Sequence, residues 1–233
     1  MTLKIEDVAG SIGRVVLDEY GREVGILVSV SADAEGNVEF VEVKYEDLGL
    51  EKVEGERVRI IDGKLTVIPE WKFEAIKLID SLDRTYKRKK GVEEMLSKGD
   101  IPAEVLRELE RKLSEQIKKL KIKAKEVEAA IKKRIEKIDN ENLHVARAMA
   151  ILQMTYFSGE VGERQFETGM SHLRKLKDAL VKEKTEAKEI LDKLTKTLEL
   201  ASGAKIHKPV EQEKKQEPTA TIPDAFTVKV VDG

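Results

Sequence analysis

Short runs in which apolar and polar residues alternate occupy the first 71 residues, and turn-forming residues separate them. A period of two residues puts successive side chains on opposite faces of a strand, so we predict β-strands here. Asp62-Gly63 is the strongest hairpin signal, because a type I′ turn requires positive φ at both central positions. Tyr20-Gly21 and residues 33–37 supply further turns. The predicted strands, which together form a small barrel, are Arg14 to Asp18, Glu23 to Val30, Val38 to Tyr45, Arg57 to Ile61 and Lys64 to Ile68.

Beyond Pro69 the apolar residues recur every three or four positions, which predicts helices. The first helix is expected to end near Gly99. Asp100 is a plausible N-cap of the next helix, with Pro102 just inside it and Glu104 in its first turn, where an acid suits the helix dipole. The apolar stripe of the first helix consists of Phe73, Ile76, Ile79, Leu82 and Tyr86.

A second and much longer helix carries an apolar seam of nine steps over 32 residues, or about 3.56 residues per step. This value lies between a strict heptad and a straight helix, so we expect weak left-handed supercoiling and a nearly straight rod. The seam continues through Val145, Met149, Leu152 and Tyr156. Its first ten members are Leu106, Leu109, Leu113, Ile117, Leu120, Ala124, Val127, Ile131, Ile135 and Ile138.

Gly159 and Gly162 interrupt this seam, and we interpret the interruption as the tip of a helical hairpin. Because the connection is short, a third helix is expected to return antiparallel to the second and to end near Gly203. At about 1.5 Å per residue, some 55 residues make a rod of roughly 80 Å. The stripe of the third helix consists of Phe166, Met170, Leu173, Leu180, Ala187, Leu191, Leu194 and Leu198.

The chain therefore divides into a β domain (1–71), a helical hairpin (72–203), a linker (204–221) and a C-terminal peptide (222–233), and its fold class is α+β. The linker has two prolines and almost no apolar side chains, so we expect it to be disordered. The peptide alternates again, with Phe226, Val228 and Val230 on one side, as a half-buried strand does. A strand without a neighbour needs a partner.

Charge is distributed unevenly, although the net charge is only −2. Residues 1–71 hold 8 basic and 16 acidic side chains, whereas residues 72–157 hold 21 basic and 15 acidic ones. An acidic head beside a basic rod favours contacts between copies, or binding of an anionic polymer or membrane to the rod. The longest stretch without charge, residues 148–159, is too short to span a bilayer.

No catalytic, cofactor or metal site is predicted. The chain has no Cys, which excludes thiolate chemistry and fits a reducing cell interior. His144, His172 and His207 lie in different segments without a second ligand at helical spacing, so incidental roles are favoured over a metal site. The many carboxylates sit among Lys and Arg on polar helix faces, which is typical of solvated surfaces rather than of acid–base pairs.

Two parts of the helical region are candidate interaction surfaces, each with a plainer interpretation beside it. Five basic residues, Arg84, Lys87, Arg88, Lys89 and Lys90, lie beside the apolar stripe of the first helix and could contact anionic lipid or DNA without sequence preference. The alternative is a solvated helix end whose stripe faces another helix. A basic tract at 118–125 is less informative, because nearby glutamates can pair with it.

Methionines and aromatic residues gather on both sides of the predicted tip. Flexible and aromatic side chains fill irregular gaps well, so packing inside the hairpin is the favoured interpretation. The alternative is an exposed patch that joins one rod to the next in a filament. The residues are Met149, Met154, Tyr156, Phe157, Phe166 and Met170.

The β domain resembles the PRC-barrel family. "SIGRVVLDEYGREVGILVSV" is similar to the opening hairpin of that family, with Gly13, Gly21 and Gly25 where it places glycines, and "GERVRIIDGKLTVIPEW" is similar to its closing hairpin. PRC-barrels occur in ribosome maturation factors, photosynthetic subunits and cell-division proteins. The barrel therefore leaves open an RNA-processing or ribosome-maturation adaptor with a coiled-coil extension.

The order of barrel, long helical hairpin, linker and terminal strand resembles the CdvA family of archaeal cell division proteins over the whole chain. The resemblance implies a non-enzymatic cytoplasmic scaffold that polymerises at the inner membrane face of the division site. It also implies that "TIPDAFTVKVV" binds the winged-helix domain of CdvB, an ESCRT-III-like protein. The residues expected to make that contact are Ile222, Phe226, Val228 and Val230.

Overall fold

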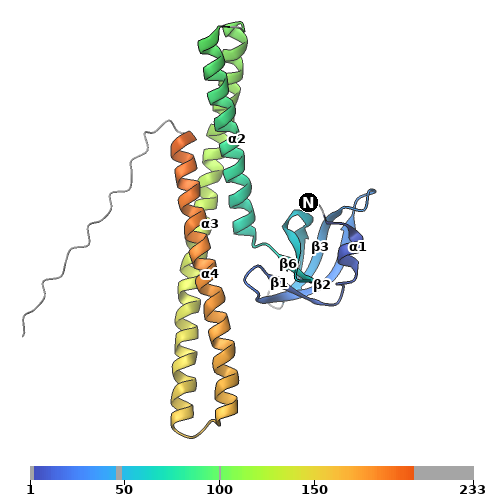
Figure 1. Ribbon diagram of the computed structural model, residues 1–233, viewed down its shortest axis with the longest axis vertical. Helices are drawn as coiled ribbons and strands as arrows, with labels where there is room; N and C mark the ends of the chain where they lie inside the picture. Colours follow the sequence, from blue (N-terminus) through green and yellow to red (C-terminus); the bar gives the residue numbers. More distant parts are fainter. Residues whose placement is uncertain (1–2, 46–48, 100, 202–233) are drawn as a thin grey trace, which may run out of the picture.

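The computed structural model describes residues 3–45, 49–99 and 101–201 of the 233-residue chain. They form a β head that lies against the side of a long helical rod (Figure 1). The predicted α+β class is confirmed. The residue Asp100, the linker 204–221 and the terminal peptide 222–233 lie outside the described residues.

The head is a six-stranded sheet in the order β4-β3-β2-β1-β6-β5. Neighbouring strands are antiparallel except β1 and β6, where Leu17 aligns with Thr66 in a parallel pair. All six strands and helix α1 contribute to one buried core, so the sheet curves around it. The elements are α1 (Ile5–Ala9), β1 (Val15–Asp18), β2 (Glu23–Ala32), β3 (Val38–Tyr45), β4 (Gly49–Glu54), the 3₁₀ turn η1 (Gly55–Arg57), β5 (Val58–Ile61) and β6 (Lys64–Val67).

Each of the five predicted strands is present, with ends shifted by at most two residues, but β4 and α1 were not predicted. In β4 only Val53 is buried, and Leu50 is exposed, so its apolar alternation is too weak to detect. The helix α1 has five residues and buries only Val8, which is too little for a helical period. The predicted hairpin turn is confirmed, because Asp62 (φ 51°) and Gly63 (φ 72°) both have positive φ.

The rod consists of three helices, α2 (Glu70–Lys98), α3 (Ala103–Phe157) and α4 (Glu163–Ala201). Gly99 ends α2 in the left-handed conformation with φ 78°, as predicted. Glu104 lies in the first turn of α3, but Pro102 is its N-cap and not its first helical residue. The fixed φ of proline and its extended ψ suit a residue that enters a helix. The helix therefore begins two positions later than an N-cap at Asp100 requires, and the prediction that Asp100 caps it is wrong.

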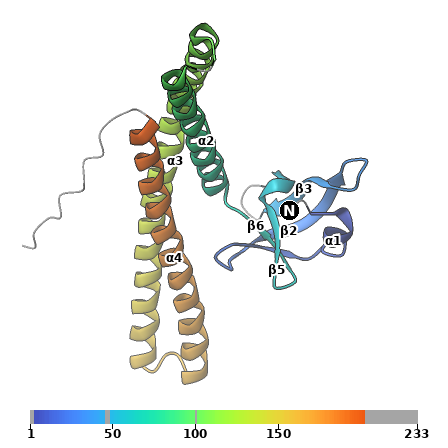
Figure 2. The same ribbon diagram turned by 45° about the horizontal axis from the view of Figure 1, so that its top comes forward.

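The three helices overlap only in the middle of the rod. There the start of α2, the centre of α3 and the second half of α4 share one core, which includes Leu82, Ile131 and Leu194. Figure 2 shows that α2 and α3 continue past the end of α4 at one end of the rod, and α3 and α4 continue past the start of α2 at the other. The rod is therefore two helices thick at each end and three in the middle.

The first helix departs from its predicted stripe. Phe73, Ile79 and Leu82 are buried, whereas Ile76 is 41% exposed. Because α2 packs on α3 and α4 together, its buried surface is wider than one stripe and also takes in Ala75 and Leu78. The sequence predicted the hairpin of α3 and α4 but did not predict α2 as a third member of the same core.

Candidate functional site: interaction surfaces of the rod

A buried carboxylate joins the head to the rod. Glu183 on α4 is only 1% exposed. Its Oε2 lies 2.7 Å from Nη2 of Arg22, which precedes β2, and its Oε1 accepts a hydrogen bond of 2.7 Å from Nε of Arg134 on α3. Arg22 also pairs with Asp18 of β1, and Arg134 pairs with Glu141. One acid thus links two helices and the sheet.

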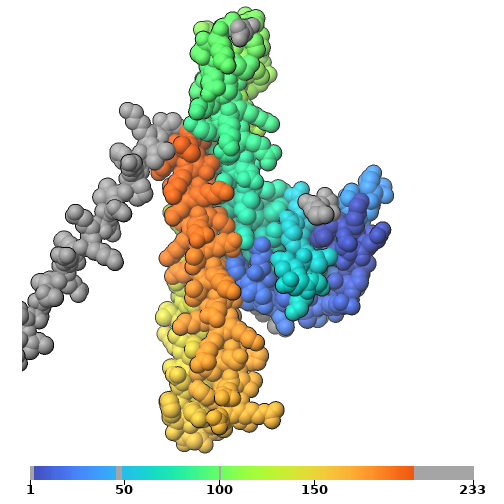
Figure 3. Space-filling view, in the orientation of Figure 1, coloured from blue at the N-terminus to red at the C-terminus, as the bar shows by residue number. Residues whose placement is uncertain are grey.

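A second group of contacts surrounds this buried acid. The hydroxyl of Tyr20 donates a hydrogen bond of 2.7 Å to Oε2 of Glu186 on α4. Nζ of Lys72 on α2 lies 2.7 Å from Oε2 of Glu19 and 2.6 Å from Oε1 of Glu186. We call these residues, together with Arg22, Arg134 and Glu183, the head–rod junction. Figure 3 shows the head packed on the side of the rod at this level.

Contacts within the junction shift the pKa values of Glu183, Lys72 and Tyr20 away from the neutral range. Burial opposes ionisation of Glu183, but the hydrogen bonds and charges of Arg134 and Arg22 outweigh it and hold the pKa of that carboxyl below its ordinary value. Burial and the hydrogen bond to Glu186 raise the pKa of Tyr20. The pKa of Lys72 is also raised, because its carboxylate partners outweigh its burial. The groups stay ionised, or neutral in the case of Tyr20, across neutral pH.

Sequence reasoning missed the junction, although a signal was present. On α4 the positions Leu180, Ala187 and Leu194 are buried at seven-residue intervals, and Glu183 falls on the same face. An acid at a position where a helix packs inward requires a cation. Arg134 on the facing helix was the available partner within the rod, but no pattern pointed to Arg22 in the head.

The predicted basic run lies on α2, in the part that extends past α4. Arg84, Lys87, Arg88 and Lys90 are exposed and Lys89 is half-buried. Lys87 pairs with Asp83 at 2.7 Å and Lys89 lies 3.6 Å from Glu93. Arg84, Arg88 and Lys90 have no ion pair among the residues that the structure describes. Three cations of the run therefore face solvent without an ion pair to another described residue.

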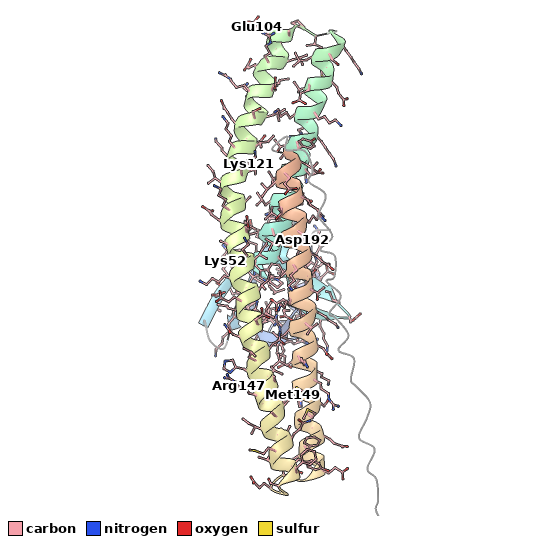
Figure 4. All side chains as sticks on the ribbon, turned by 90° about the vertical axis from the view of Figure 1, so that its left-hand side faces the viewer. Lys52, Glu104, Lys121, Arg147, Met149 and Asp192 are labelled. Carbon is pink, nitrogen blue, oxygen red and sulfur yellow. The ribbon has the colours of Figure 1, made fainter. Side chains whose placement is uncertain are left out.

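The methionine and aromatic cluster at the tip is partly packed inside the hairpin and partly exposed on its surface. Met170 is buried, and the rings of Tyr156 and Phe166 stack with their centroids 4.3 Å apart, so these side chains close the hairpin. Met149 is half-buried and packs beside Ile138 and Leu180 (Figure 4). Met154 and Phe157 point outward and are 63% and 81% exposed. Packing accounts for one part of the cluster, and an apolar surface patch remains.

Other candidate chemistry finds no support in the described parts of the chain. His144 and His172 are exposed on different helices, and His207 lies outside them. Residues 3–45, 49–99 and 101–201 contain no group of three or more side chains placed to hold a metal ion. Within the same ranges, the helices are too polar or too short to cross a bilayer. The partner-binding residues Ile222, Phe226, Val228 and Val230 are not described.

The described residues thus form a sheet domain anchored by ion pairs to a coiled-coil rod, an architecture whose exposed faces suit contacts with other molecules. Residues 70–219 match the family described as CdvA-like coiled-coil domain. A cell division protein A of Sulfolobus acidocaldarius is 27% identical over 221 residues, which cover 93% of this chain and 92% of the relative. No solved structure matches. The chain belongs to the CdvA-like family of cell division proteins.

Proposed function

We propose that the protein is a non-enzymatic cell-division scaffold that polymerises into filaments at the division site and recruits an ESCRT-III-like protein to the membrane. Membership of the CdvA-like family gives the setting. The observation that carries polymerisation is a rod whose longest helix has 55 residues, about 80 Å, with large apolar side chains exposed near its ends. Such a rod offers different surfaces at its two ends, and contacts between unlike surfaces build open filaments.

Recruitment is assigned to the C-terminal peptide. Residues 222–231 alternate apolar and polar side chains, and an extended segment of this kind adds as a strand to the sheet edge of a partner. Main-chain hydrogen bonds then supply affinity, while Ile222, Phe226, Val228 and Val230 supply specificity. We propose the winged-helix domain of the ESCRT-III-like protein CdvB as this partner. The 18 residues of the linker span about 23 Å on average as a flexible coil, enough to reach a partner beside the rod.

Attachment to an anionic surface is assigned to the basic run on α2. Arg84, Arg88 and Lys90 are exposed and make no ion pair among the described residues, so they can contact lipid phosphates or a DNA backbone. Simple phosphate contacts carry no base readout, so DNA binding by this run should have no sequence preference. This surface and the C-terminal peptide together would place the partner at the inner membrane face.

Calorimetry tests the recruitment step with full-length protein and the isolated winged-helix domain of the partner. Burying one large apolar side chain contributes about 1.5–3 kcal/mol, so Phe226→Ala should weaken binding roughly ten- to hundredfold. Thr227→Ala is the matched control, because the alternation of the sequence assigns its side chain to the opposite face of the proposed strand, and the change should alter affinity little. Equal affinities for the wild-type protein and Phe226→Ala would refute recruitment by this peptide.

The RNA-processing alternative makes a different prediction for the same protein. A ribosome-maturation adaptor would co-sediment with a ribosomal subunit at physiological salt and would not require the C-terminal peptide. A scaffold would pellet on its own as filaments. Sedimentation of full-length protein with and without purified ribosomal subunits distinguishes the two, and comigration that survives removal of residues 222–233 would favour the adaptor.

A further inference from the structure

The two ends of the rod are incomplete in different ways. At one end, which we call the receiving end, α2 residues 83–98 and α3 residues 103–117 pack as a pair without α4. At the other end, the rod tip, α3 residues 143–157 and α4 residues 163–173 pack as a pair without α2. Figure 4 shows Glu104 near the first end of α3 and Met149 near the second.

At the receiving end, the face of α3 that α4 covers elsewhere is exposed. Leu109, Val127 and Val145 are spaced by 18 residues, which is five turns of about 3.6 residues, so they share one face of α3. Val127 and Val145 are 7% and 5% exposed and pack in cores that include α4. Leu109 is 43% exposed and Val105, one turn before it, is 51% exposed. The same seam thus continues beyond the end of α4.

At the rod tip, α3 carries a second apolar stripe that its own hairpin leaves uncovered. Leu143, Ala150 and Phe157 follow one another at seven-residue intervals, the spacing of a coiled-coil seam, and all three are exposed. Leu143 is 58% exposed, Met154 is 63% exposed and Phe157 is 81% exposed. Three large apolar side chains on one outward face are more than a solvated helix needs, and they indicate a surface that another helix covers.

The two incomplete ends match in length. The α2 member of the central core nearest the receiving end is Leu82, and α2 continues for sixteen residues from there to Lys98, about 24 Å. The stripe from Leu143 to Phe157 covers fifteen residues, or fourteen steps of about 1.5 Å, which is about 21 Å. Counted over the helices of the two ends, the tip holds two basic and two acidic side chains, and the receiving end holds nine basic and seven acidic ones. The match therefore rests on length and apolar surface.

We propose that the tip of one rod docks lengthwise on the receiving end of the next copy, with Met154 and Phe157 covering Leu109 and Val105. The four helices of the two ends then form a bundle in line with the three-helix centre. The contact is between unlike surfaces, so it repeats from copy to copy and builds an open filament along the rod axis. This inference rests on the proposed polymerisation and names the surfaces that carry it.

Assembly of surface variants tests the proposal by light scattering. Met154→Ser and Phe157→Ser at the tip, and Leu109→Ser at the receiving end, should each raise the protein concentration needed for assembly roughly tenfold or more. Ile122→Ser is the matched control, because Ile122 is 66% exposed on the same helix but lies outside both ends. Absence of assembly by the wild-type protein would contradict the proposed function, whereas wild-type assembly by the end variants would overturn this inference alone.

Cross-linking identifies the pairing, and the absence of native cysteines leaves no background. Two single variants, Met154→Cys and Leu109→Cys, are assembled separately and as a mixture and treated with a short bis-maleimide. The proposal predicts cross-linked dimers in the mixture and little product from either variant alone. Self-cross-linking of Met154→Cys would show a symmetric tip-to-tip dimer and overturn the proposal. Failure of the mixture to cross-link, as expected if another segment covers Leu109, would also overturn it.

Discussion

Glu183 is an acid on the inward face of its helix, and its two arginine partners come from elements that are far apart in the chain. Arg22 belongs to the head and Arg134 to α3, so the carboxylate fixes where the sheet sits on the rod. An isolated buried charge would be strongly unfavourable, and these partners remove that cost through hydrogen bonds to both carboxylate oxygens. The orientation of the head therefore depends on a few named side chains.

Neutralising this carboxylate tests the junction directly. Glu183→Gln leaves two partly buried arginines with one acidic partner each, and we expect a loss of about 2–4 kcal/mol in the free energy of unfolding. Urea unfolding followed by Trp71, the single tryptophan, reports on the adjoining core. Glu128→Gln is the control, since its exposed pair with Lys132 within one helix is worth about 0.5 kcal/mol or less. Equal losses in the two variants would contradict the role of Glu183.

The same carboxylate sets an acid limit on stability. Its folded pKa lies below the ordinary value of about 4.3, so its contribution is complete above that pH and is lost as the pH falls through the folded pKa. The raised pKa of Lys72 acts at the other extreme, because its contribution is lost only as the pH rises beyond the usual lysine range. Wild-type protein should therefore lose stability below about pH 4.3 more steeply than Glu183→Gln. Parallel acid curves would contradict this.

Gly55 in the head lies so close to the backbone of Val38 that its position has no room for a side chain. A Cβ on Gly55 would lie 2.1 Å from the carbonyl oxygen of Val38, so Gly55→Ala should destabilise the head by about 1–3 kcal/mol. Gly10→Ala is a matched control, because nothing lies within 4 Å of its Cβ and its backbone is right-handed helical. Thermal unfolding by circular dichroism should show a drop for the first variant and little change for the second.

Among the helices and strands, the periodicity of the sequence predicted those with a clear apolar stripe. It missed features that depend on packing between distant parts of the chain. The ends of α3 and α4 follow from their stripes, and the hairpin turn follows from Asp62 and Gly63. Strand β4 was missed because it buries only Val53, since as an edge strand it packs on one neighbour. The third helix of the central core was missed because a stripe shows that a face is buried but not which helix buries it.

Two triple variants with the same change in net charge can show whether the position of the basic run on α2 matters for binding. Replacing Arg84, Arg88 and Lys90 by Gln should weaken binding to anionic vesicles or DNA, and the slope of the salt dependence should fall by roughly one unit for each phosphate that the variant no longer neutralises. The same change at Lys118, Lys119 and Lys125, which are also exposed on the rod, is the control for net charge. Identical salt dependence in the two triple variants would remove the run from the account.

The whole molecule combines three properties in one chain. The junction holds the head at a fixed place on the rod, the rod ends present unlike apolar surfaces, and the sequence places a strand-like peptide beyond a long linker. In the proposed scaffold, the surfaces that build the filament are separate from the peptide that binds the partner, so each can be changed without affecting the other. Phe226→Ala should therefore weaken recruitment roughly ten- to hundredfold and leave assembly unchanged.

Negative-stain imaging of full-length protein at low salt, with light scattering across protein concentration, tests self-association most directly. We expect filaments whose amount rises with concentration and falls when Met154 and Phe157 are replaced by Ser. We also expect that Ile122→Ser assembles as the wild-type protein does. A compact monomer at high protein concentration and low salt would contradict the account.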